Sequence, residues 1–268
     1  MEYLRRVRAV LAILALSALA FAGCDIRVEG NGFSIGPLSG RATDEWQRTY
    51  TVQPGGSVEI VNVNGRIRVM RGTGSDVVVR AERVTRASTD ESARELLDQV
   101  RLEESSGDGG VKIETRVPRV RGRGGVEVHY DVAVPDGLSV TVRTTNGGIA
   151  LDRVDGRVIA ATVNGGIDGT GLAGHIDAST TNGAIDLEVA DVRDGVRAKT
   201  VNGGVSVLIP KSTRADLVAS VVNGGISVDS VALDEAVRNR RRLEGRLNGG
   251  GPSIELGTVN GGIRLAGQ

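Results

Sequence analysis

Asn146-Gly147-Gly148-Ile149 is the phrase around which this chain is organised, because the sequence returns to it at a nearly fixed interval. From Asn146 to Asn223 the phrase recurs in steps of 18, 18, 20 and 21 residues. Such a period is typical of repeat architectures, in which each unit packs on its neighbours. The seven copies carry asparagines that we expect to form a structural ladder: Asn64, Asn146, Asn164, Asn182, Asn202, Asn223 and Asn260.

Each unit of the array contains two short segments in which residues alternate with period two. In one unit, the alternate residues of one face are Val158, Ala160, Thr162 and Asn164. After the Gly-Gly step that follows, the alternation restarts one residue out of phase, so a parity is skipped. A skipped parity indicates a corner, because glycine adopts positive φ without a Cβ penalty. The pattern predicts an all-β fold, a parallel β-solenoid resembling a single-stranded β-helix, with coils of about 18–21 residues. A second glycine in each unit marks the opposite corner: Gly156, Gly174 and Gly195.

Asn-Gly between alternating strands is also the strongest short signal for a β-hairpin, so the array could instead fold as an antiparallel meander. Stacked coils are favoured because repeats with the same residues in the same phase gain most when identical positions are neighbours. In that arrangement the asparagine amides would hydrogen-bond along the stack, as amide ladders do in cross-β assemblies.

The composition favours a thin core and excludes one class of partner. Of 268 residues, 40% are apolar and 39 are glycine, but only six are aromatic, none of them between Asn146 and Gln268. A core of Val, Ile, Leu, Ala and Thr suits a solenoid better than a sandwich built around a buried Trp. The formal net charge is zero, which gives no electrostatic case for binding nucleic acid.

The N-terminus resembles an export signal. Arg5, Arg6 and Arg8 precede an uncharged apolar run, Ala9–Ala22, which is shorter than the ~20 residues of a spanning helix. The run ends in Phe21-Ala22-Gly23-Cys24, which resembles the bacterial lipobox, so Cys24 is the predicted lipidation site. Phe21 stands where that motif usually has Leu. There are therefore two alternatives to a lipoprotein: export with ordinary cleavage, and an N-terminal anchor that is not cleaved.

These signals predict three parts: a signal peptide (1–23), a flexible tether (24–45) and a β-solenoid domain (46–268). Within the domain, 46–134 would carry the outlying first copy and one helix near 88–101, and 135–268 the tandem coils. A capping box at Ser88-Thr89-Asp90-Glu91 predicts the helix start. Its packing face is predicted by the stripe Ala93, Leu96, Leu97 and Val100.

Few residues suggest chemistry. Neither His129 nor His175 has a cysteine or a second histidine at metal-ligand spacing, so we expect no catalytic residue, no metal site and no cofactor. Asp168, Asp177 and Asp186 follow one another in steps of nine residues and could line a flank of the solenoid. Solvated outward faces account for them more simply.

The array is interrupted between Asn223 and Asn260. This stretch predicts two strands around a glycine turn, after which the last copy would close the array. Its basic residues could bind phosphate or lipid headgroups, although a solvated excursion paired with Asp234, Glu235 and Glu244 is the simpler interpretation. The basic residues are Arg238, Arg240, Arg241, Arg242 and Arg246.

Three phrases carry a family resemblance: Gly55-Gly56-Ser57-Val58-Glu59-Ile60, Val132-Ala133-Val134-Pro135-Asp136-Gly137 and the recurrent Thr-x-Asn-Gly-Gly-Ile. Over about residues 46–267 the chain resembles a bacterial domain family of unknown function, labelled "putative adhesin" or β-strand repeat-containing protein. The resemblance implies an exported or membrane-attached envelope protein with a parallel β-solenoid. It implies no established activity and no catalytic residues.

The sequence therefore predicts a non-enzymatic lipoprotein of the bacterial envelope, on the periplasmic or cell-surface side. It would be held in a membrane through Cys24 and present a scaffold or adhesive surface to an envelope polymer or protein. The alternative is a carbohydrate-active β-helix enzyme that uses Asp168, Asp177 and Asp186 on a polysaccharide.

Overall fold

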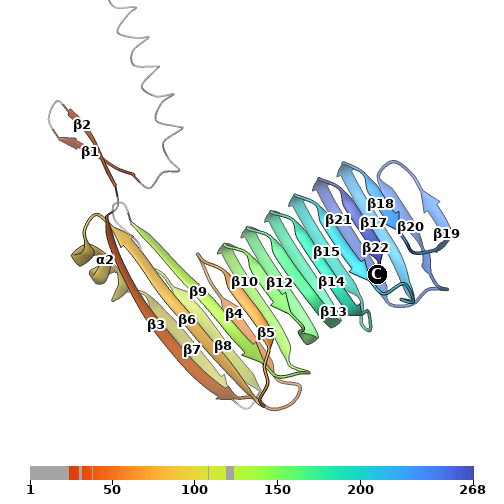
Figure 1. Cartoon of the computed structure of the whole chain (residues 1–268), viewed down its shortest axis with the longest axis horizontal. Helices are drawn as coiled ribbons and strands as arrows, with labels where there is room; N and C mark the ends of the chain where they lie inside the picture. The colour runs from red at the N-terminus through yellow and green to blue at the C-terminus, as the bar shows by residue number, and fades with distance from the viewer. Residues whose placement is uncertain (1–23, 30–31, 38, 108, 119–123) are drawn as a thin grey trace, which may run out of the picture. The chain divides into compact units, whose positions relative to one another are not determined.

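The computed structural model describes residues 24–29, 32–37, 39–107, 109–118 and 124–268, so the predicted signal peptide lies outside the described residues. Within these ranges the fold is all-β with one helix, and it is β-solenoid-like (Figure 1). No helix in these ranges combines the length and the apolar character needed to span a bilayer. The chain divides into two compact units, which we describe separately.

The smaller unit includes Val84–Val100 and the helix predicted near 88–101. This helix, α2 (Asp90–Leu97), follows Thr89, whose hydroxyl accepts a hydrogen bond from the Ser92 amide at 3.2 Å. The cap satisfies an amide that the first turn of the helix leaves without a partner. The helix buries Ala93 in a small apolar cluster with Ala42 and Ala87, against which Leu97 packs.

Residues 24–45 contain regular structure, unlike the flexible tether expected there. β1 (Cys24–Glu29) and β2 (Gly32–Pro37) pair antiparallel as a separate two-stranded sheet. β3 (Gly40–Thr51) then begins before the predicted start of the domain. The glycine and serine content of this stretch suggested a tether, whereas the apolar residues of both β1 and β2 alternate with period two, which is a strand signal.

The larger unit contains Glu45–Arg83, Arg101–Val117 and Glu127–Gln268. Its N-terminal part contains a hairpin, in which β7 and β8 pair antiparallel. The first copy of the repeat, β4 and β5, pairs in parallel with β8 and β9. The strands of this part are β4 (Ser57–Val61), β5 (Ile67–Arg71), β6 (Asp76–Ala87), β7 (Arg101–Gly107), β8 (Gly110–Arg116) and β9 (Gly125–Val134).

The tandem repeats supply two runs of strands. Before the Asn-Gly steps come β10 (Ser139–Asn146), β12 (Asp155–Asn164), the second half of β13 (Ile167–Asn182), β15 (Val196–Asn202), β17 (Ala215–Asn223) and β21 (Ser253–Asn260). After the steps come β11 (Ile149–Asp152), the first half of β13, β14 (Ile185–Asp191), β16 (Val205–Ile209), β18 (Ile226–Asp229) and β22 (Ile263–Gly267).

Neighbouring repeat strands pair in parallel, so equivalent residues lie side by side (Figure 1). Val140 lies opposite Val158, and Val158 lies opposite Ile176, which is not the pairing of an antiparallel meander. The core therefore consists of stacked aliphatic columns, as the lack of rings in the array requires. One such column, buried throughout, contains Ile67, Ile149, Ile167, Ile185, Val205, Ile263 and Ile226.

The repeats follow one another in space in a different order from their order in sequence. β21 lies between β15 and β17, since Ile254 pairs with Val196 on one side and with Leu217 on the other. The expectation that the copy at Asn260 closes the array is therefore wrong. The other edge of β17 pairs antiparallel with β20 (Arg242–Leu247), so the returning chain can add a parallel strand only at the inner edge.

β20 belongs to a hairpin that ends the stack. It pairs antiparallel with β19 (Leu233–Arg238), whose register shifts between Asp234 and Val237. Leu243 and Leu247 of β20 are buried, whereas Val237 of β19 is 68% exposed. A bulged strand over the last repeat protects its edge from adding further strands. The sequence predicted β20 and β21 as strands, but they flank β17 instead of pairing with each other.

Candidate functional site

Threonine hydroxyls line the buried side of the Asn-Gly corner. The hydroxyls of Thr162, Thr180, Thr200 and Thr258 donate to the carbonyl oxygen of a glycine in the neighbouring repeat at 2.8–2.9 Å. A buried hydroxyl is costly unless it is bonded, so these contacts stabilise each junction between repeats. This role was not predicted from the sequence, although the recurrent Thr-x-Asn-Gly was the available signal.

The seven predicted asparagines lie in one column. Beginning with Asn146, each Nδ2 donates to the Oδ1 of the asparagine in the preceding repeat of the stack at 2.7–2.9 Å. The spatial order is Asn64, Asn146, Asn164, Asn182, Asn202, Asn260 and Asn223. From Asn146 onward the residues are exposed, because each asparagine ends its strand at the corner. Water competes with exposed bonds, so each contributes at the lower end of about 0.5–1.5 kcal/mol.

Close approach of neighbouring backbones explains the first glycine of each step. A Cβ on Gly147, Gly165, Gly183, Gly203 or Gly261 would lie 1.9–2.1 Å from the carbonyl oxygen of the equivalent glycine in the next repeat. The second position is open. A Cβ on Gly148, Gly204 or Gly262 would lie 3.5–3.8 Å from the nearest carbonyl oxygen of the adjoining repeat, and the chain itself has Ala184 at the equivalent position. Contact between repeats, more than a positive φ, therefore requires the first glycine.

The residue before each asparagine is β-branched, and from Thr145 onward it is exposed. Val163, Val201, Val222 and Val259 are 37–49% exposed, and together with Val237 they are the exposed large hydrophobic residues of the described chain. A shallow groove of about 480 Å³ lies on the other side of the asparagine column, over the last repeats. Its lining combines second-position residues, aliphatic residues and polar residues. It is lined by Ala184, Gly204, Gly225, Gly262, Asp186, Ser206, Ser227 and Arg264 among others.

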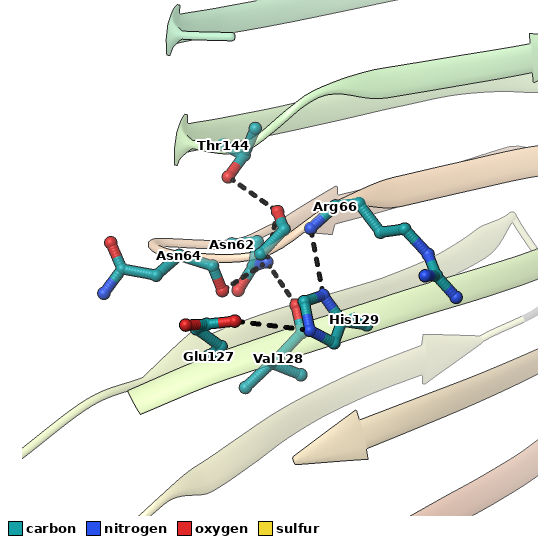
Figure 2. Close-up of polar contacts among 8 residues, drawn as sticks. Asn62, Asn64, Arg66, Glu127, Val128, His129 and Thr144 are labelled. Atoms are coloured by element: carbon teal, nitrogen blue, oxygen red, sulfur yellow. Dashed lines mark hydrogen bonds and ion pairs between the residues drawn. The ribbon is translucent and has the colours of Figure 1, made fainter. Parts of the chain in front are cut away.

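The first repeat differs because it stacks on β9 instead of on another Asn-Gly step. Asn62 takes the position of the threonine and donates from Nδ2 to the Val128 carbonyl oxygen at 2.8 Å (Figure 2). Beside it, the amide of Arg66 donates to Nδ1 of His129 at 3.2 Å, and Nε2 lies 3.4 Å from Glu127. Because Nδ1 accepts a hydrogen bond, the neutral ring carries its proton on Nε2, next to the carboxylate. Asn62 and His129 thus supply the contacts between the first repeat and β9 at this end of the ladder.

The structure brings together two of the three predicted aspartates. Asp168 and Asp186 lie opposite each other in register, whereas Asp177 belongs to the other run of strands and lies opposite Arg197. The nine-residue steps therefore do not place three carboxylates along one flank. Partial burial, and secondly the charge of Asp168, raise the pKa of Asp186 above its usual value.

We expect Asp186→Asn to stabilise the protein at neutral pH by ~0.2–1 kcal/mol, the range for cross-strand pairs. A raised folded-state pKa means that the folded protein binds more protons than the unfolded chain between the two pKa values. Stability of the parent thus falls as pH rises through that interval. The advantage of Asn should be complete above the folded pKa and vanish below the usual Asp value of about 3.9. Urea unfolding at neutral and acid pH measures it. Asp177→Asn, opposite an arginine, should bring no gain, and equal effects of the two variants would contradict the pair.

The other candidate residues are dispersed over the structure. His175 lies beside Gly174, and its Nδ1 is 3.1 Å from the Asp194 carbonyl oxygen. In the ranges that the structure describes, no group of three or more His, Cys, Asp or Glu side chains could hold a metal ion. Cys24 occupies the first position of β1.

The arginine-rich stretch forms the hairpin that ends the stack. Arg246 lies 3.1 Å from Glu235, and Arg242 pairs with Glu244, which are two of the acidic partners expected from the sequence. Arg238 donates to the Ile226 carbonyl oxygen of β18 at 2.9 Å. Arg238 therefore connects the hairpin to the last repeat, whereas the two ion pairs lie within the hairpin.

The stacked strands and the ladder define a β-solenoid-like repeat protein. The chain belongs to the Toastrack DUF4097 family, whose model matches residues 57–266. This confirms the resemblance noted from the sequence. No curated protein matches the chain.

Solved structures with a related course of the chain include a "putative cell adhesion protein" from Clostridium sporogenes ATCC 15579. It shares 12% identity and a TM-score of 0.49, and the match covers 84% of this chain and all of that one. A "putative adhesin" from Bacteroides fragilis NCTC 9343 shares 12% identity and a TM-score of 0.42, over 84% of this chain and 97% of its own. Similarity at this level carries no argument about function.

Proposed function

We propose that this protein is a non-enzymatic lipoprotein of the bacterial cell envelope. Its signal peptide, residues 1–23, directs export, and acylated Cys24 holds it in a membrane. Its repeats form a parallel β-solenoid of about 18–21-residue coils, which serves as a rigid scaffold or binding surface for an envelope polymer or protein.

The use of the recurrent polar residues carries this proposal. The threonines bond to glycine carbonyls and the asparagines bond to one another, so the residues that the repeats share serve the stack. A stack stabilised by identical contacts between neighbours gives a surface of regular spacing. The lipobox resemblance of Phe21-Ala22-Gly23-Cys24 supports the anchor.

Metabolic labelling with a radioactive fatty acid tests the anchor. The full chain should incorporate label in a bacterial host, and Cys24→Ser should incorporate none at an equal amount of protein, because Cys24 is the sole cysteine of the sequence. Label retained by Cys24→Ser would place the acyl group elsewhere. An unlabelled parent found in the medium would indicate plain secretion instead.

A further inference from the structure

The two exposed columns at the Asn-Gly corner form one continuous surface, which we call the neutral strip. It consists of the asparagine ladder and of the residues that precede each asparagine. In spatial order those residues are Val63, Thr145, Val163, Thr181, Val201, Val259 and Val222. No residue of the strip is charged, although 25% of the chain is. We propose that the neutral strip docks a second copy of this chain.

The apolar residues of the strip indicate that it is an interface. Four of the five exposed large hydrophobic residues of the described chain lie in this column: Val163, Val201, Val222 and Val259. Scattered exposed valines need no explanation, but an aligned row of them marks an interaction surface. A partner covering the strip buries this apolar area without desolvating a charge of the strip.

The shape of the surface favours a partner with the same surface. The strip is a ridge, and the groove of about 480 Å³ runs beside it on the side of the second-position residues Gly204, Gly225 and Gly262. A two-fold axis parallel to the stack, between ridge and groove, places the ridge of each copy in the groove of the other. Each repeat then lies beside the same repeat of its partner.

The spacing of the repeats also favours a second copy. Strands of neighbouring repeats lie about 4.8 Å apart, whereas an extended peptide rises only about 3.3–3.4 Å per residue. A peptide laid along the strip would fall out of step within a few residues, but another stack of the same repeats stays in step along its length. The zero net charge of the chain removes the long-range repulsion that would oppose such pairing.

Sedimentation velocity of the full chain in detergent, over a series of concentrations, tests the proposal. The parent should pass from monomer to dimer as concentration rises. Val201→Lys with Val259→Lys should weaken the dimer at least tenfold, because two charges then enter the apolar contact. Val237→Lys is the matched control, since Val237 is 68% exposed but lies outside the strip, in β19, and this variant should dimerise like the parent.

A second variant tests the groove without changing the ridge. A Cβ on Gly225 would meet nothing within 4 Å, so Gly225→Leu fits the folded monomer but fills the groove. It should weaken the dimer as the lysine pair does, at an unchanged thermal midpoint. The proposal is overturned if the parent stays monomeric at every concentration. It is equally overturned if the strip and groove variants dimerise as well as the parent.

Discussion

Gly203→Ala should lower the free energy of unfolding by about 3 kcal/mol, at the upper end of the range for overpacked sites. The new Cβ would lie 2.0 Å from the Gly183 carbonyl oxygen, which is backbone and cannot turn aside. The repeats would have to separate there. Separation weakens the hydrogen bond from the Gly183 amide to the Asn202 carbonyl, 3.0 Å, and the bond that Thr200 donates to the Gly183 carbonyl. Urea unfolding followed by far-ultraviolet circular dichroism measures the loss.

Gly204→Ala is the matched control, one residue further along the chain. Its Cβ would lie 3.5 Å from the Gly262 carbonyl oxygen, an ordinary van der Waals contact, and Ala184 occupies the equivalent position in another repeat. We expect a change within ~0.5 kcal/mol, as for an ordinary surface substitution. If both alanine variants were equally destabilised, backbone conformation and not contact between repeats would explain the glycines.

The sequence predicted the asparagine positions well because the signal was repetition itself. Residues that recur in one phase, such as Asn164 and Asn182, become neighbours in any stack that keeps its register. Repetition does not reveal distances between repeats, however. The reason for the first glycine and the bond from Thr180 to the Gly165 carbonyl depend on how closely two backbones approach.

Parity alone does not predict the exposure of the ladder, for a related reason. Thr162 and Asn164 share a parity, yet the threonine is buried and the asparagine is exposed. Period two places two residues on one face only while the strand stays straight. The strand ends at Asn164, at the corner that begins with Gly165, and there Val163 and Asn164 are both exposed, which creates the neutral strip. The valines were visible in the sequence, but their exposure was not.

The spatial order of the repeats was hidden by the 36 residues that lie between Asn223 and Asn260. Their composition suggested a solvated excursion, whereas they form β19 and β20, and β20 takes one edge of β17. Which edge a hairpin occupies depends on long-range pairing, which local patterns do not encode. The edge of β17 that the hairpin occupies decides whether the final copy lies at the end of the stack or between the two preceding copies.

Ile263→Ala should cost about 3 kcal/mol, although Ile263 is the sixth residue from the C-terminus. Its side chain is 2% exposed and lies in register between Val205 and Ile226, so truncation leaves a cavity inside the stack. Ile226→Ala removes the same atoms at the equivalent position of the outermost repeat, where the side chain is 9% exposed, and should cost distinctly less. Repeats stacked in sequence order would reverse this ranking, because Ile263 would then lie at the end. Chemical unfolding of the two variants under identical conditions decides between the two orders, and a larger loss for Ile226→Ala would contradict the inserted position of β21 and β22.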